Sequence, residues 1–478
     1  MIAQLLNREF LLSELAAAQT GLAQELTMRE RRGRPGPLDE YSDTEIQAII
    51  DMIAAVADTP EGLVGATPME EGEFDAPGLR PKDDFGFVPR DPLLSILQTA
   101  FEDTVETREP EAITQRPLLD DRRSGDVPVI TDRQLASVRL YRTPDGRRLW
   151  KPFEVARPKV LSDPRWVWAG VIILWNRQNN PAPFNATPPA PIPVADNARI
   201  LLVGDWGSGL PRAQAVARHM RHELDDGIAA RREQHVIHLG DVYYTGGERE
   251  YRERFLKHWP VAPDEDIGSY SLNGNHDMYQ GGHAYFGTCL ADARFARQER
   301  SSFFALRSTH WQLLGLDTSY EDAGLYGEQA QWALARLDES PDLRTVLLSH
   351  HQPFSAYEPG AGVLRQKIAP VLETNRIDAW FWGHEHRCLV YEPHMKIGFS
   401  SCVGHGGIPE YLIAREGTPY REPLRYDYRR RYGNGPEPWD TFGFAVLDLD
   451  GDAMSIRYID EHGECHHEER IDARPGRG

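Results

Sequence analysis

Short apolar runs, each followed by a polar loop and then a helical pattern, dominate the chain from Ala198 onward. Ile200–Val203, Val236–Leu239 and Trp380–Trp382 are examples. Runs of this length, rich in branched and aromatic residues, are typical of buried strands. Because parallel strands alternate with helices in α/β proteins, the pattern predicts a sheet whose strands end at a common edge.

The intervals between these runs predict the other elements. Pro at the first position of a helix and apolar residues three or four apart favour helices. A turn at Asp450-Gly451-Asp452 predicts a hairpin from Ala445 to Ile456. We expect helices at 211–232, 251–259, 327–337 and 363–372, and further strands at 270–272, 303–306, 311–316 and 346–348.

Residues 1–195 follow a different pattern and are predicted to form a mostly helical accessory region. Leucines from Leu5 to Leu26 fall on one helical stripe, and Ser42 with Glu45 forms a capping box before a second helix. These two helices predict a hairpin that packs or oligomerises. The segment 59–127 is rich in Pro, Gly and Asp, with one short helix expected at 92–101.

The end of this region predicts strands and a boundary. Pro144-Asp145-Gly146 predicts a hairpin, and the apolar run Trp166–Trp175 predicts a buried strand. Six prolines between Pro181 and Pro193 are typical of a stiff connector. We therefore divide the chain into an N-terminal region, 1–195, and a catalytic domain, 196–470.

The composition of the chain argues against two classes of protein, nucleic-acid binders and membrane-spanning proteins. Asp and Glu outnumber Lys and Arg by 73 to 53 in 478 residues, a net charge of −20 that argues against a nucleic-acid binder. No apolar run approaches the roughly 20 residues of a membrane helix. The N-terminus lacks a basic segment, and the four cysteines show no close pairing, so we expect a cytoplasmic protein with reduced thiols.

Five loops carry residues that can bind metal ions. Taken alone, an Asp after a strand is more often a helix cap or turn residue, and paired histidines can be merely solvated. Together, the loops supply two Asp, a Tyr, an Asn and three His, enough for two metal ions, at positions that a common sheet edge would bring together. The loops are Gly204-Asp205-Trp206-Gly207, Gly240-Asp241-Val242-Tyr243-Tyr244, Gly274-Asn275-His276-Asp277, Ser349-His350-His351 and Gly383-His384-Glu385-His386.

In their order and composition these loops resemble those of the calcineurin-like metallophosphoesterases, and more narrowly the purple acid phosphatases. The wider family begins with Asp-x-His, whereas Gly207 stands at the third position here. Purple acid phosphatases have Asp-x-Gly there and a Tyr three residues after the second Asp, which matches Tyr244 after Asp241. The resemblance covers about 198–403 and implies a four-layer αββα sandwich with the helical N-terminal region as an extension.

The resemblance implies two metal ions that share Asp241. The site that contains the Tyr244 phenolate would suit Fe, and the other site would suit Fe, Zn or Mn. The first set of implied ligands is Asp205, Asp241, Tyr244 and His386, and the second is Asp241, Asn275, His350 and His384.

The resemblance also implies the reaction, hydrolysis of phosphomonoesters or small phosphodiesters by in-line attack of a metal-bound hydroxide. His276 would act as general acid or electrostatic clamp, Asp277 would orient it, and His351 is a weaker candidate for substrate contact.

Two alternatives stay open: a nucleotide or cyclic nucleotide phosphodiesterase, and a partner-binding scaffold with vestigial catalysis. The expected partner is a small phosphate ester, without nucleic acid or membrane span. The sequence identifies no protein partner for the N-terminal region, and the pocket residue His405 is most simply part of a Gly-rich turn.

Overall fold

The computed structural model describes most of the chain from Pro181 onward. The chain has two compact units, one made of Met1–Ile2 with Pro181–Gly478 and the other of Ala3–Asn180. The described residues are 19–20, 23, 26–27, 44, 47, 50, 95–96, 99–100, 140–142, 148–150, 181–410, 412, 420, 422–432 and 439–474.

Most predictions for residues 1–180 fall outside the described part. The described positions between 19 and 100 are helical, as the two helices and the short helix at 92–101 require. Strands β1 (Leu140–Arg142) and β2 (Arg148–Trp150) pair antiparallel, which confirms the hairpin predicted around Pro144-Asp145-Gly146. The expected strand at 166–175 lies outside the described residues.

The Pro-rich segment belongs to the unit that begins at Pro181 and packs along it. The Ala182 amide donates to the Gly281 carbonyl at 2.8 Å, and the Tyr320 hydroxyl donates to the Ala182 carbonyl at 2.7 Å. Strand β3 (Ile192–Pro193) then pairs with strand β7 (Phe304–Arg307). The unit therefore includes the prolines that the sequence analysis treats as the connector, starting with the first of them, Pro181.

One sheet of this unit has eight strands in the order β13-β11-β12-β10-β9-β8-β7-β3. Its central strands β8, β9, β10 and β12 are parallel, so their carboxyl ends point to one edge. The bounds not yet given are β8 (Trp311–Gly315), β9 (Arg344–Ser349), β10 (Ile377–Trp382), β11 (Cys388–Tyr391), β12 (Ile397–Val403) and β13 (Leu424–Asp427).

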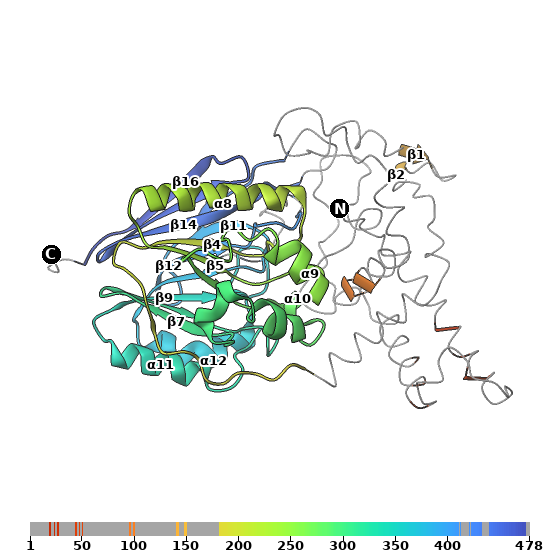
Figure 1. Ribbon diagram of the computed structural model, residues 1–478, viewed down its shortest axis with the longest axis horizontal. Coiled ribbons are helices and arrows are strands. Elements are labelled where there is room, and N and C mark those ends of the chain that lie inside the picture. The colour runs from red at the N-terminus through yellow and green to blue at the C-terminus, as the bar shows by residue number, and fades with distance from the viewer. Residues whose placement is uncertain are drawn as a thin grey trace. The chain divides into compact units, whose positions relative to one another are not determined.

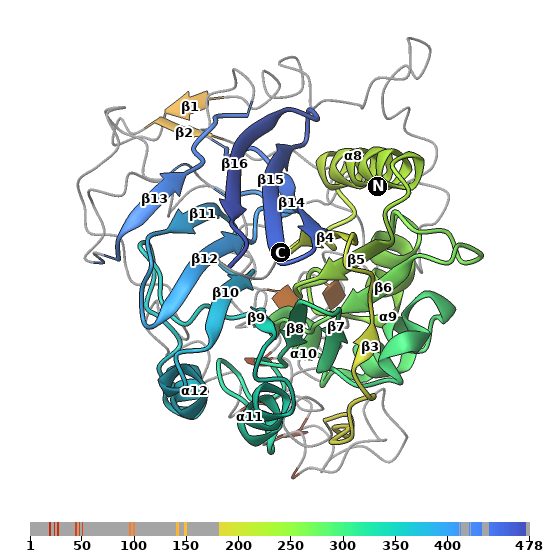
Figure 2. The ribbon, with the colours of Figure 1, turned by 90° about the vertical axis from the view of Figure 1, so that its left-hand side faces the viewer.

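The other sheet has six strands in the order β16-β15-β14-β4-β5-β6 (Figure 2). Strands β4, β5 and β6 are parallel, and the remaining three are antiparallel additions. The bounds are β4 (Arg199–Val203), β5 (Gln234–His238), β6 (Gly268–Ser271), β14 (Gly443–Asp450), β15 (Ala453–Asp460) and β16 (Cys465–Ile471).

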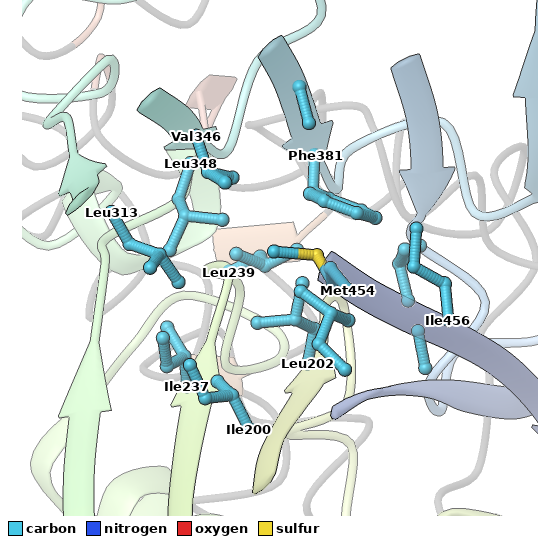
Figure 3. Packing of buried hydrophobic residues seen from close by; sticks show 14 of the residues in the cluster. Ile200, Leu202, Ile237, Leu239, Leu313, Val346, Leu348, Phe381, Met454 and Ile456 are labelled. Carbon is cyan, nitrogen blue, oxygen red and sulfur yellow. The ribbon is translucent and has the colours of Figure 1, made fainter. Parts of the chain in front are cut away.

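Three apolar clusters hold four layers together. The first lies between the two sheets and joins residues such as Leu202 and Met454 of one sheet to Val346 and Phe381 of the other (Figure 3). The second packs α8 (Pro211–Ala229) on the six-stranded sheet, and the third packs α11 (Gln329–Glu339) and α12 (Gly362–Glu373) on the eight-stranded sheet. Figure 1 shows these helices on opposite sides of the sandwich, so the predicted αββα architecture is confirmed.

The predicted strands and long helices from residue 198 to 382 are all present, with ends within a few residues of the expected ones. The predicted helix 251–259 is instead a short α9 (Glu248–Glu250) that continues as a π-helical turn, Tyr251–Leu256. Three shorter helical segments complete the list: α10 (Asn275–Met278), Tyr285–Cys289 and Ala293–Gln298. Within the described part of the chain, none of the helices has the length and apolar character required to cross a bilayer.

Candidate metal centre

The carboxyl ends of the parallel strands in the two sheets meet at one edge. The Asp205 amide donates to the Gly240 carbonyl at 2.9 Å, which joins the loops after β4 and β5. The Gly383 amide donates to the His350 carbonyl at 3.0 Å, which joins the loops after β10 and β9. The Gly204 amide donates to the Val403 carbonyl at 3.0 Å and so connects the sheets. The loops that were predicted to converge therefore do so.

Close approach of the backbone at this edge requires glycine at two positions. Gly240 has a φ of +103°, and a Cβ there would lie 2.6 Å from Nδ1 of His350. A Cβ at Gly274 would lie 2.0 Å from Oδ1 of Asp241. Any larger residue would displace a side chain of the centre, so both glycines set its geometry.

Asp205, Tyr243 and His386 form one side of the centre. Oη of Tyr243 lies 3.1 Å from Oδ1 of Asp205 and 2.9 Å from Nε2 of His386. Nε2 of His386 is 3.4 Å from Oδ1 of Asp205, and all three side chains are buried. Burial, with the neighbouring carboxylates Asp241 and Asp205, raises the pKa of the Tyr243 phenol well above its usual value.

The phenol at this position differs from the one that the sequence analysis names. The resemblance to purple acid phosphatases implied Tyr244, three residues after Asp241, as the ligand, but the hydroxyl among the carboxylates belongs to Tyr243. Tyr244 instead accepts a 2.7 Å hydrogen bond from Nδ1 of His276 at its backbone carbonyl, and its ring lies under the Arg254 guanidinium. The loop after β5 thus turns the earlier tyrosine toward the centre, which spacing alone does not reveal.

Asn275, His350 and His384 form the other side. Oδ1 of Asn275 lies 2.9 Å from Nε2 of His350 and 3.1 Å from Nδ1 of His384. Nδ2 of Asn275 donates to the Tyr279 hydroxyl at 2.6 Å, which directs the amide oxygen toward the two histidines. Nδ1 of His350 donates to the Leu239 carbonyl at 2.9 Å, so Nε2 presents its lone pair to the centre.

Asp241 stands between the two sides. Its Oδ2 is 3.1 Å from Oη of Tyr243, whereas its Oδ1 is 3.5 Å from Nε2 of His350. Burial acts to raise the pKa of Asp241, but the surrounding imidazoles outweigh it and lower the pKa to about 2. One carboxylate thus offers an oxygen to each side, the arrangement that a shared ligand requires.

His276 lies beside the centre with a buried nitrogen that has no hydrogen-bond partner. Its backbone amide donates to Oδ1 of Asp241 at 3.0 Å, and its Nδ1 is held by the Tyr244 carbonyl. The remaining Nε2 lies 3.9 Å from Oδ2 of Asp241 and is unpartnered. Burial lowers the pKa of this imidazole.

Asp277 does not hydrogen-bond to His276, contrary to its predicted role as orienting carboxylate. It sits at the third position of α10, and its side chain turns back to the loops. Oδ2 accepts from the Asp241 and Gly274 amides at 2.9 and 2.6 Å, and Oδ1 accepts from the Val242 amide at 3.0 Å. Asp277 therefore holds the backbone that presents Asp241.

His351 and Glu410 complete the surroundings. The His351 ring lies 4.6 Å from that of His384, and its Nδ1 is 3.2 Å from the Thr318 hydroxyl. Glu410 was not predicted: its Oε2 lies 3.3 Å from Nδ1 of His386 and orients that imidazole. Glu410 lies in a loop several residues beyond the end of β12. Because it does not directly follow a strand, the sequence pattern did not identify it.

Comparisons with known proteins indicate which family the chain resembles. Residues 198–388 match the family model described as calcineurin-like phosphoesterase. Tartrate-resistant acid phosphatase type 5 of Mus musculus is 22% identical over 345 residues, which cover 65% of this chain and 98% of that protein. The Homo sapiens protein of the same name is 22% identical, with 59% of this chain and 94% of that protein covered.

Among solved structures, the GAP50 anchor of the Plasmodium inner membrane complex aligns with a TM-score of 0.46 at 13% identity, over 59% of this chain and 90% of that one. The family match spans the strands whose ends carry Asp205, Asp241 and His384. Residues 198–388 therefore match the calcineurin-like phosphoesterases, a family of metal-dependent hydrolases, and the chain is similar to the purple acid phosphatases.

Proposed function

We propose that the chain is a binuclear metal-dependent phosphatase that hydrolyses phosphomonoesters or small phosphodiesters. The observation that carries this proposal is the position of Asp241, one oxygen of which faces Tyr243 and the other His350. The acid phosphatase relatives, covered over nearly their whole length, support the same substrate class.

The donor atoms fit two cations. The single proton of the Tyr243 hydroxyl faces three acceptors, on Asp205, Asp241 and His386, and can satisfy only one of them at a time. On the other side, Nδ1 of His350 donates to the Leu239 carbonyl, so in the neutral imidazole the lone pair of Nε2 faces the amide oxygen of Asn275 at 2.9 Å. A cation on each side would satisfy these opposed lone pairs.

The proposed ligands differ from the predicted set at one position. Tyr243 replaces Tyr244 beside Asp205, Asp241 and His386, while the second set keeps Asp241, Asn275, His350 and His384. Two carboxylates and a phenolate are hard anionic donors that suit Fe, and the imidazole-rich set suits divalent Fe, Zn or Mn. The bound pair would supply Lewis acidity, which activates water and neutralises charge on a transferring phosphoryl group.

The chain's own side chains position the substrate. Because Nδ1 of His276 donates to the Tyr244 carbonyl, Nε2 is left to contact the substrate, and we propose that in the protonated imidazolium it donates a hydrogen bond to a phosphate or leaving-group oxygen. His351 is the second proposed contact, since its ring lies against that of His384. Asp277 acts as a positioning residue for the Asp241 loop rather than as a partner of His276.

Turnover of phosphate esters tests the proposal directly. Metal-replete protein is assayed with p-nitrophenyl phosphate, bis(p-nitrophenyl) phosphate and cyclic nucleotides, and chelator-treated protein serves as control. We expect hydrolysis of the monoester that is lost on chelation and restored by Fe, Zn or Mn. Exclusive activity on cyclic nucleotides would favour the nucleotide phosphodiesterase, and no turnover of any ester would favour the scaffold and contradict the proposal.

We also propose a cytoplasmic location. The cysteines within the described part of the chain are free thiols, three of them buried and Cys465 exposed. An exposed free thiol is more compatible with a reducing compartment. Fractionation of cells that express the full chain would test this location.

A further inference from the structure

A second group of side chains of the kind that can bind a metal ion has no residue in common with the candidate metal centre. Cys388, His405 and His466 present one ligand atom each, and these atoms all lie within 4.8 Å of one another. Cys388 opens β11 in the eight-stranded sheet, and His466 belongs to edge strand β16 of the six-stranded sheet. His405 follows β12, so the group joins edge strand β16 of one sheet to β11 and β12 of the other, near that sheet's edge strand β13 (Figure 2).

A β-bulge turns His466 toward the group. Tyr458 of β15 pairs with His467, but Ile459 pairs with Cys465, so His466 is the extra residue on β16. Successive side chains of a regular strand point to opposite faces, whereas here His466 and His467 both stack on tyrosines of the other sheet's edge. The His466 ring lies 3.6 Å from that of Tyr428, and the His467 ring lies 3.9 Å from that of Tyr426.

The imidazoles in this group have buried nitrogens without partners. His405 is 2% exposed, and neither of its ring nitrogens makes a hydrogen bond. Nδ1 of His466 meets the Tyr426 hydroxyl at 3.0 Å, while its Nε2 is buried and unpartnered. Leaving buried polar atoms unpaired destabilises a fold, so these nitrogens favour a ligand between them. Burial lowers the pKa of both histidines, that of His466 to about 4, so both rings are neutral, as metal ligands must be.

We propose that Cys388, His405 and His466 bind one Zn²⁺ ion that crosslinks the two sheets. A thiolate with two imidazoles is a soft nitrogen and sulfur set, unlike the oxygen-rich centre around Asp241. The three ligands leave a fourth position for water, and the Cys388 thiol loses its proton to solvent when the ion binds. The site shares no residue with the candidate metal centre and is independent of the proposed function.

Cobalt substitution tests the site with a readout that the candidate metal centre cannot give. Full-length protein is treated with chelator and titrated with Co²⁺ alone. We expect a near-ultraviolet thiolate-to-cobalt absorption band in the wild type and in Cys465→Ser, the exposed-thiol control. The band should be absent in Cys388→Ser and in His466→Phe, which keeps an aromatic ring against Tyr428 but removes both nitrogens.

Zinc content and thermal unfolding provide the second measurement. Zn²⁺ added to chelated wild type should raise its Tm by roughly 5 °C more than it raises that of His466→Phe. The wild type should also bind one more ion per chain than this variant, while phosphatase activity of the two stays similar. A thiolate band that persists in His466→Phe, or a wild type without a band and without the extra ion, would overturn the proposal.

Discussion

The two sides of the candidate metal centre present different chemistry from the same kind of structural position. Asp205, Tyr243 and His386 form an anionic side, whereas Asn275, His350 and His384 form a neutral side. Both sides draw their residues from loops at the ends of parallel strands. The anionic side comes mainly from the six-stranded sheet, and the neutral side comes mainly from the eight-stranded sheet. The fold therefore sets where the ligands meet, and the residue types decide which cation each side prefers.

Asp241 is the residue that both sides share, and its loss should have the largest effect. Asp241→Ala removes an oxygen from each side, so we expect both metal ions to bind weakly and turnover to fall by roughly 10³–10⁵-fold, since such Lewis-acid stabilisation is worth several kcal/mol. Metal analysis and kcat measure the effect. Asp264→Ala, on an exposed turn, is the control. Loss of metal from one side only would mean that Asp241 is not shared.

His276 tests whether a residue beside the centre acts on substrate without holding metal. His276→Ala should keep the full metal content and lose roughly 10²–10⁴-fold in kcat, because the proposed hydrogen bond from Nε2 to substrate is gone. Metal content by mass spectrometry and kcat with p-nitrophenyl phosphate separate the two effects. A variant that loses metal would place His276 among the ligands instead.

The two adjacent tyrosines give the sharpest test of the anionic side. Tyr243→Phe should remove any tyrosinate-to-iron absorption and reduce activity by roughly 10–100-fold, while Tyr244→Phe should keep the colour, since the hydroxyl that lies among Asp205, Asp241 and His386 belongs to Tyr243. The visible spectrum of iron-loaded protein measures this difference. The reverse result would restore the spacing-based assignment to Tyr244.

Substitution of Glu410 should have the smallest effect, and this effect should be limited to the anionic side. Glu410→Gln weakens the orientation of His386, so we expect about tenfold lower affinity for the metal on the anionic side and no change on the neutral side. Metal titration of chelated protein measures both affinities, with the exposed Glu328→Gln as control. Equal weakening of both sides would show that Glu410 acts on the whole loop.

The sequence predicts the residues that directly follow strands. Asp205, Asp241, His350 and His384 are of this kind, because strand patterns are readable and the ends of parallel strands converge. Most apolar strands were recognised for the same reason, although the buried strands β11 and β12 were not predicted. In contrast, β16 alternates exposed and half-buried residues at the sheet edge and carries little apolar signal, so it was missed.

Positions that depend on loop conformation or on sheet packing could not be predicted. Which of Tyr243 and Tyr244 faces the centre depends on the path of one loop, and Asp277 turned to the backbone because of its place in α10. The group of Cys388, His405 and His466 depends on a bulge and on contact between edge strands. His405 was therefore interpreted only as part of a Gly-rich turn.

Anomalous diffraction from crystals of protein purified without added metal tests the central claim most directly. The account predicts two peaks separated by roughly 3.5–4 Å on either side of the Asp241 carboxylate. One peak would lie within bonding distance of Oη of Tyr243 and the other near Nε2 of His350. A single peak at this edge, or two peaks that do not share Asp241, would contradict the account.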